Sequence, residues 1–471
     1  MKELAFSTVS DLSAALNNKA LSPVELLKDV LNRLDKLEPT LNMFAAFDAE
    51  GAMADARASE ERQMRGALRS PLDGIPTSIK DLIAQKGLPL RFGSNASSPE
   101  PAGVDAPAVE RLRAAGAVLL GKSTTSEFGC KPVGDSPLTG ITRNPWNIDK
   151  TPGGSSCGAA AMVAAGLVPY AIGTDGGGSV RIPASMCGLF GIKAQFGRVP
   201  IFPVSATPTL AHVGPISRTV QDAATVLSTI AGFDPRDPYS ILEPVPDYLM
   251  STRAERKLKI AWSPTLGFAN PDPEIVEICA KAVDQLRDIG HEIDEVDHVM
   301  DDPEDLWNAE FYAGVGTRLR TIIEQDPDKL DPAVLEVLKI AISQEMQDYY
   351  TRVFQRYDFR EKMRTFFDRY DLLISPTLPS AAVDVGKNSP EFLKNRSIVS
   401  WVFYTYAFNL TGQPAASMPV GFTQANLPVG MQVVGRSNDE DTIFALCGGY
   451  QHAFGLHKQR PELTEIQRSV P

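Results

Sequence analysis

The sequence predicts an α/β protein, because short β-like runs and helical runs alternate along the chain from Pro71 onward. Such alternation is typical of α/β or mixed-sheet architectures. Apolar residues make up 43% of the 471 residues, so the chain can bury a large core. The predicted strands include Ala117–Leu120, Tyr170–Gly173, Leu258–Trp262 and Leu372–Ser375, and the predicted helices include Ala106–Ala115 and Val220–Ala231.

Residues 1–65 are expected to form a helical region that packs on the remainder of the chain, residues 66–471. Ser22 and Glu25 have the spacing of a capping box, and Pro23 fits the first position of a helix. Apolar residues then recur at helical spacing, at Leu26, Leu27, Val30, Leu31 and Leu34. This stripe predicts a helix with one face against the main body.

Three later stretches suggest how the rest of the chain is organised. Residues 301–370 combine charged and aromatic side chains with helical periodicity, which predicts an inserted helical layer over the active site. The most apolar stretch, Ala159–Ile172, is shorter than the roughly 20 residues of a membrane span. It predicts a buried helix and the strand that follows it. The proline-rich stretch Pro235–Pro246 predicts a long surface connection.

Charge and cysteine content limit the partners and the location of the protein. A net charge of −12 argues against nucleic acid and against an anionic membrane as partners, since both prefer a basic surface. The five cysteines form no CxxC pair, so neither a disulfide framework nor a zinc site is indicated. No signal-peptide pattern is recognisable at the N-terminus, and we expect a reduced, cytoplasmic location.

The segment with the clearest chemical signal places three glycines, Gly176, Gly177 and Gly178, directly before Ser179. A backbone without Cβ atoms can approach a ligand closely and direct several N–H groups at one oxygen. An oxyanion hole requires this arrangement. A tight turn that needs glycine for its positive φ angles is the alternative interpretation.

Lys80 is the candidate base. It stands between the apolar Ile79 and Asp81 in the run Gly74-Ile-Pro-Thr-Ser-Ile-Lys80-Asp81. A lysine is ordinarily a solvated surface cation. If Lys80 is instead buried among hydroxyl groups, desolvation lowers its pKa and the neutral amine can accept a proton.

Together these motifs resemble the amidase signature family. The resemblance spans nearly the whole chain, and it rests on several ordered stretches. These are Gly74-x-Pro76-x-x-x-Lys80-Asp81, Gly121–Phe128, Arg143–Trp146, Gly153-Gly154-Ser155-Ser156, Gly173-x-Asp175-x-Gly177-Gly178-Ser179-x-Arg181-x-Pro183, Asn409–Ala415 and Leu427–Gly435. It implies the amidase signature fold, in which helices flank a large central mixed β-sheet, with 66–471 as the catalytic domain.

The resemblance also implies the site residues. Ser155 and Ser179 have the spacing of the family's bridging serine and nucleophile, with Lys80 as the base and a cis peptide bond before the bridging serine. The backbone N–H groups of Gly176, Gly177, Gly178 and Ser179 are then the expected oxyanion hole. Ser156, Asp175 and Arg181 are expected to support this site, the last two through a hydrogen bond or an ion pair.

The implied activity is hydrolysis of a carboxylic amide of a small molecule to a carboxylate and ammonia or an amine, through an acyl-enzyme on Ser179. Esters, anilides and carbamates (a urethanase activity) are further substrates that the family resemblance allows. No cofactor and no metal are expected, since neither HExxH nor paired His/Cys spacing occurs. Two positions depart from the family pattern: Cys157, expected to be a small buried filler with nothing placing it near a base, and Gly176, where relatives carry a larger residue.

Three alternatives are left open by the sequence. Gly154-Ser155-Ser156-Cys157-Gly158 also fits the nucleophile elbow of α/β-hydrolases, which would make Ser156 the nucleophile and require a histidine. The chain could instead be the glutamine-hydrolysing subunit of a tRNA-dependent amidotransferase, or a non-catalytic scaffold. The sequence also leaves open whether the protein is a monomer or a homodimer. Five aromatic residues could line either the pocket or the core: Trp401, Phe403, Tyr404, Tyr406 and Phe408.

Overall fold

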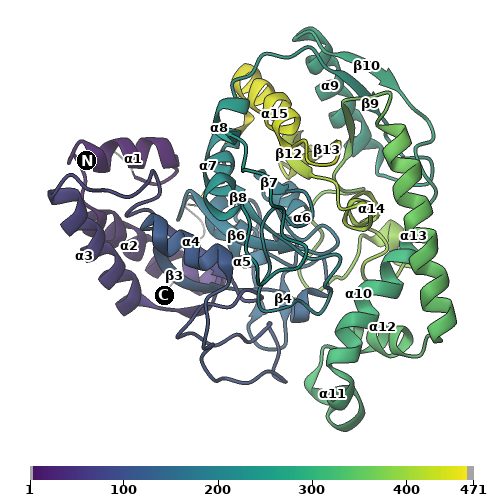
Figure 1. Ribbon diagram of the computed structural model, residues 1–471, viewed down its shortest axis with the longest axis horizontal. Helices are drawn as coiled ribbons and strands as arrows, with labels where there is room; N and C mark the ends of the chain where they lie inside the picture. Colours follow the sequence, from purple (N-terminus) through teal and green to yellow (C-terminus); the bar gives the residue numbers. More distant parts are fainter. Residues whose placement is uncertain (1–3, 464–471) are drawn as a thin grey trace.

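A computed structural model describes residues 4–463 and is built on one large mixed sheet of 11 strands, in the order β1-β3-β2-β6-β8-β7-β12-β13-β11-β9-β10 (Figure 1). The strands of this sheet are β1 (Phe44–Phe47), β2 (Pro76–Lys80), β3 (Val118–Ser123), β6 (Tyr170–Asp175), β7 (Phe190–Lys193), β8 (His212–Ser217), β9 (Lys259–Trp262), β10 (Glu292–Glu295), β11 (Leu372–Pro376), β12 (Ala415–Phe422) and β13 (Pro428–Gly435). Strands β4 (Asp135–Ser136) and β5 (Gly140–Ile141) form a separate small sheet.

Parallel and antiparallel pairs both occur in the large sheet, as a mixed α/β fold requires. Strand β2 is parallel to both β3 and β6, whereas β6, β8, β7, β12, β13 and β11 run antiparallel to one another in turn. Strands β11, β9 and β10 are again parallel. The predicted α/β fold with a large mixed sheet is therefore confirmed.

Helices cover both faces of the sheet, and the side chains of each strand divide between the two faces. Leu372 and Ile374 lie in one buried cluster and Leu373 lies in another, as expected for a strand whose successive side chains point to opposite faces. The helices are α1 (Val9–Asn17), α2 (Pro23–Leu41), α3 (Ala49–Met64), α4 (Pro107–Ala115), α5 (Cys157–Ala164), α6 (Arg181–Met186), α7 (Val220–Ile230), α8 (Tyr248–Ser251), α9 (Pro273–Asp288), α10 (Glu304–Arg318), α11 (Arg320–Gln325), α12 (Pro332–Ile342), α13 (Met346–Phe366), α14 (Phe403–Thr411) and α15 (Glu440–Phe454).

The individual elements predicted from the sequence agree with the structure to within a few residues at their ends. The predicted strands correspond to β3, β6, β9 and β11, and the predicted helices to α4 and α7. The capping box at Ser22 is present, because its side chain accepts from the N–H of Glu25 and the Glu25 carboxylate accepts from the N–H of Ser22. The apolar stretch forms α5 followed by β6, and among the described residues no helix has the length and hydropathy to cross a membrane.

The N-terminal 65 residues are not wholly helical, which corrects the expectation for this region. Helices α1, α2 and α3 are present, but β1 lies between α2 and α3 and pairs antiparallel with β3 at the edge of the sheet. Its four residues, Phe-Ala-Ala-Phe, are too few to show the alternation that identifies a strand. The N-terminal region therefore contributes a strand to the large sheet.

Helices α10 to α13 occupy the 301–370 stretch and lie together at one side of the molecule (Figure 1). Their inner residues share a buried cluster with α14, which carries most of the aromatic group in question. Trp401, Phe403, Tyr404, Tyr406 and Phe408 are all fully buried in that cluster. These five side chains therefore belong to the core.

Candidate active site

Lys80 is the last residue of β2, and it is completely buried. Its Nζ lies within hydrogen-bond distance of three hydroxyl oxygens, at 2.7 Å from Ser155 Oγ and 2.9 Å from both Ser156 Oγ and Thr174 Oγ1. Burial lowers the pKa of the Lys80 amine to about 7, although its electrostatic interactions with Cys157 and Asp175 oppose the shift. A large fraction of Lys80 is therefore neutral near neutral pH.

Ser155 and Ser156 immediately precede α5, and both are buried. The peptide bond between Gly154 and Ser155 is cis, as the family resemblance implies. Ser156 Oγ also lies 3.2 Å from the carbonyl oxygen of Thr174 and 3.3 Å from its backbone nitrogen. Ser156 is thus bound to Lys80 and to the backbone of β6, whereas Ser155 lines a cavity.

Cys157 lies closer to the base than the sequence suggested. It is buried as expected, and its Sγ lies 3.5 Å from Thr124 Oγ1. Burial raises the pKa of the Cys157 thiol, but Lys80 is near enough for its positive charge to oppose that rise. The expectation that Cys157 is remote from a base was therefore wrong, because the first turn of α5 folds back beside β2.

Ser179 lies in the loop between β6 and α6, is partly exposed, and lines the same cavity as Ser155. Separate donors bind successive carbonyl oxygens of this loop. Trp307 Nε1 donates to Gly176 O at 2.8 Å and Thr405 Oγ1 donates to Gly177 O at 2.6 Å. Two more donors complete the set: Asn409 Nδ2 binds Asp175 O at 3.1 Å and Ile182 N binds Gly178 O at 2.7 Å.

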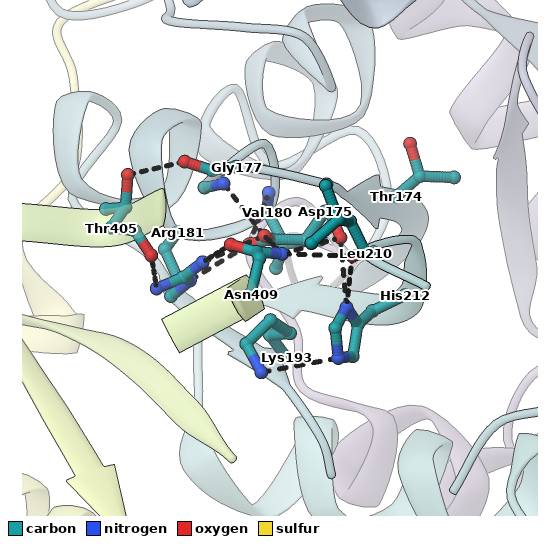
Figure 2. Close-up of polar contacts among 12 residues, drawn as sticks. Thr174, Asp175, Gly177, Val180, Arg181, Lys193, Leu210, His212, Thr405 and Asn409 are labelled. Atoms are coloured by element: carbon teal, nitrogen blue, oxygen red, sulfur yellow. Dashed lines mark hydrogen bonds and ion pairs between the residues drawn. The ribbon is translucent and has the colours of Figure 1, made fainter. Parts of the chain in front are cut away.

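Asp175 and Arg181 form the buried ion pair that the sequence predicted (Figure 2). Arg181 Nη2 and Nε donate to the two carboxylate oxygens of Asp175 at 2.9 and 3.0 Å. Burial alone would raise the pKa of Asp175, but the Arg181 guanidinium outweighs it and holds this pKa well below its usual range. The carboxylate also accepts from the N–H of Gly178 at 2.8 Å, so the ion pair fixes the loop before Ser179.

His212 is the histidine among the described cavity-lining residues, and both of its ring nitrogens are occupied (Figure 2). Nδ1 lies 2.8 Å from Leu210 O and 3.2 Å from Asp175 O, so it must carry the hydrogen. Nε2 then accepts from Lys193 Nζ at 3.4 Å. Burial lowers the pKa of His212 well below its ordinary value. This side chain is held neutral with no free lone pair, which argues against it as a general base for Ser156.

The cavity in front of Ser179 has a volume of about 350 Å³ and a mostly apolar wall. Helix α10 contributes to it, and so does the segment 200–207. Further apolar walls come from Leu90, Phe92, Phe128, Val213 and Phe311. Its charged side chains, among the described residues, are Asp175, which is paired with Arg181, and the exposed Arg318. The interior can therefore take an uncharged, apolar group.

Several of these residues were not identified from the sequence. Thr174 lies within the quoted motif around Ser179, and Asn409 begins another quoted stretch, so both had a weak signal. Trp307 and the segment 200–207 had none beyond the aromatic content of 301–370. Within residues 4–463, no three His, Cys, Asp or Glu side chains are grouped as a metal site requires.

Comparisons with known proteins agree with this site. The sequence model of the Amidase family matches residues 25–444. An acylamidase from Rhodococcus erythropolis is 34% identical over 458 residues, covering 96% of each chain, and a glutamyl-tRNA(Gln) amidotransferase subunit from Roseiflexus sp. (strain RS-1) is 35% identical, covering 97% of this chain and 98% of that one. Among solved structures, a bacterial aryl acylamidase of the amidase signature family superposes with a TM-score of 0.90 and 27% identity over 99% of both chains. The substrate complex of 6-aminohexanoate cyclic dimer hydrolase superposes with a TM-score of 0.89 and 26% identity over 98% of this chain and 99% of that one.

Proposed function

Since the chain belongs to the amidase signature family and is a hydrolase of carbon–nitrogen amide bonds other than peptide bonds, we propose that Ser179 is its nucleophile, Ser155 its proton bridge and Lys80 its base. One observation carries this assignment. Lys80 is buried, its pKa is lowered to about 7, and its Nζ lies 2.7 Å from the hydroxyl of Ser155. A neutral amine in that position can accept a proton from a serine.

The reaction begins when the lone pair of Lys80 accepts the proton of Ser155 and Ser155 accepts the proton of Ser179. Ser179 Oγ then forms a bond to the amide carbonyl carbon, whose oxygen becomes an oxyanion. The proton returns from Lys80 through Ser155 to the leaving nitrogen, and the carbon–nitrogen bond breaks. This protonation is required because an amide anion is a very poor leaving group. Water then attacks the acyl-enzyme, gives up a proton through the same relay, and the carboxylate leaves.

The oxyanion hole is assigned to the N–H groups of Gly176, Gly177 and Ser179. Gly178, which the sequence placed with them, is left out because its N–H already donates to Asp175 at 2.8 Å. A donor lost from an oxyanion hole typically costs about 3 kcal/mol of transition-state stabilisation. Asp175 and Arg181 then support the reaction by holding the loop, and Ser156 by holding Lys80.

The substrate is proposed to be an amide with an apolar acyl or aryl group, because the cavity wall is mostly apolar. The similarity to an acylamidase and an aryl acylamidase supports this choice. Glutamine fits less well, because its α-ammonium group would need a free carboxylate, and Asp175 is already paired with Arg181. We therefore place the stand-alone amidase ahead of the amidotransferase subunit. The cytoplasmic location and the choice between monomer and homodimer stay predictions.

A substrate panel tests this proposal. Aryl amides, short aliphatic amides, glutamine, esters and carbamates are compared for the wild type and for Ser179→Ala. We expect kcat/KM to be highest for amides with an apolar acyl or aryl group, and Ser179→Ala to abolish turnover of all of them with the fold unchanged by circular dichroism. A preference for glutamine would favour the amidotransferase subunit, and an active Ser179→Ala variant would rule out the nucleophile.

A further inference from the structure

Helix α10 contacts the glycine loop through two aromatic rings, those of Trp307 and Phe311. The indole N–H of Trp307 donates to Gly176 O at 2.8 Å. A Cβ atom at Gly177 would lie 2.6 Å from Trp307 Cζ2, and one at Gly176 would lie 2.7 Å from Phe311 Cε2. Only glycine fits at these two positions, so the departure at Gly176 makes room for a ring of the helical layer.

The hydrogen bond from Trp307 determines the direction of one N–H group in the loop. A trans peptide group is planar, and its C=O and N–H point in opposite directions. The carbonyl of Gly176 and the N–H of Gly177 belong to the same peptide group. When Trp307 holds the Gly176 oxygen, the Gly177 N–H is therefore directed away from the indole.

Trp307 is itself held rigidly, so it can act as a fixed donor. Its side chain is 1% exposed. The ring stacks on Phe311 with centroids 4.4 Å apart, and on Tyr406 with centroids 5.7 Å apart. Glycine on both sides of the peptide group offers little steric resistance to its rotation. The indole hydrogen bond is thus a main restraint on this peptide plane.

We propose that Trp307 is a positioning residue that aims the Gly177 N–H at the oxyanion, acting through the peptide group between Gly176 and Gly177. The proposal rests on the assignment of Ser179 as the nucleophile. It gives the helical layer a role in the reaction itself, in addition to forming a wall of the cavity.

The test compares Trp307→Phe, which keeps an aromatic ring and removes the N–H, with Tyr406→Phe as a matched control. Tyr406 stacks on the same indole, but its hydroxyl donates to Asp302 at 2.7 Å and not to the loop. For each protein we measure kcat, KM and the dissociation constants of two ligands. One is an apolar trifluoromethyl ketone, which gives an oxyanion when a serine adds to it, and the other is an unreactive amine analogue of the substrate.

Trp307→Phe should lower kcat about ten- to hundredfold, somewhat less than outright removal of an oxyanion donor. The affinity for the ketone should fall by a similar factor, while KM and the affinity for the amine analogue change less than about twofold. Tyr406→Phe should change none of these values by more than about twofold. If Trp307→Phe does not fold, β-(3-benzothienyl)alanine at position 307 tests the same point, because sulfur replaces the N–H in a ring of the same shape.

Two outcomes would overturn the proposal. Wild-type kcat in the Trp307 variant would show that the hydrogen bond does not aim the loop. Equal losses of affinity for the ketone and for the amine analogue would show that the ring only shapes the cavity. Failure of the underlying assignment is seen separately in the wild type, where the ketone would then form its adduct at a residue other than Ser179.

Discussion

The buried position of Lys80 makes a quantitative prediction for the pH dependence of catalysis. Lowering the lysine pKa from 10.5 to about 7 means that burial costs the charged form about 5 kcal/mol relative to water. With a pKa of about 7, roughly 10% of the amine is neutral at pH 6 and roughly 90% at pH 8. Since the neutral form is the base, kcat/KM for an amide should rise about tenfold between these pH values and then level off.

The assay measures kcat/KM for one uncharged amide from pH 5.5 to 9.5 at constant ionic strength, with circular dichroism at each end to show that the fold persists. Lys80→Arg is the matched control, because its guanidinium cannot deprotonate, and its activity should fall about a thousandfold. If Lys80 kept its ordinary pKa of 10.5, the rate would rise about a hundredfold from pH 6 to 8 and continue to rise to pH 10. That profile, a flat one, or an active arginine variant would refute this account of the base.

Three further substitutions test the parts of the site separately. Ser155→Ala should lower amide hydrolysis much more than hydrolysis of an activated ester, because only the amide leaving group needs the relayed proton; equal losses in both rates would reduce Ser155 to a purely positioning role. Gly176→Ala should lower kcat because the new methyl group meets the Phe311 ring at 2.7 Å, and adding Phe311→Ala should restore part of that loss; no gain in the double variant would show that the ring is not the obstacle. Asp175→Asn should lower the free energy of unfolding by about 3–5 kcal/mol in urea denaturation, since it leaves the Arg181 guanidinium buried without its counter-charge; a change below about 1 kcal/mol would mean that the ion pair contributes little to stability.

Local patterns in the sequence were sufficient to predict most of the fold. The capping box at Ser22 and the apolar runs that became β6 and β11 depend on neighbours within a few residues, so their signals are visible in the sequence. Strand β1 was missed because its pairing with β3 comes from a segment more than 70 residues later in the chain, which no local pattern records. The aromatic residues of α14 were ambiguous for a similar reason, since density of aromatic residues does not reveal which side of a helix faces a cavity.

The candidate site was predictable where residues belong to contiguous motifs, and it was not where distant side chains complete it. Lys80, Ser155 and Ser179 stand in such motifs. The donors that fix the loop, Trp307 and Thr405, lie more than 120 residues after it and became visible only in the structure. The engagement of the Gly178 N–H by Asp175 likewise depends on loop geometry that composition cannot show.

The central claim, that Ser179 carries the acyl group, is tested most directly by mass spectrometry of the enzyme trapped with a serine-directed covalent inhibitor. Peptide mapping of the wild type should find the label on Ser179, and labelling should disappear in Ser179→Ala while the protein stays folded. Label on Ser156 would contradict the account, because it would make Gly154-Ser155-Ser156-Cys157-Gly158 a nucleophile elbow and leave the buried Lys80 without a role in the reaction.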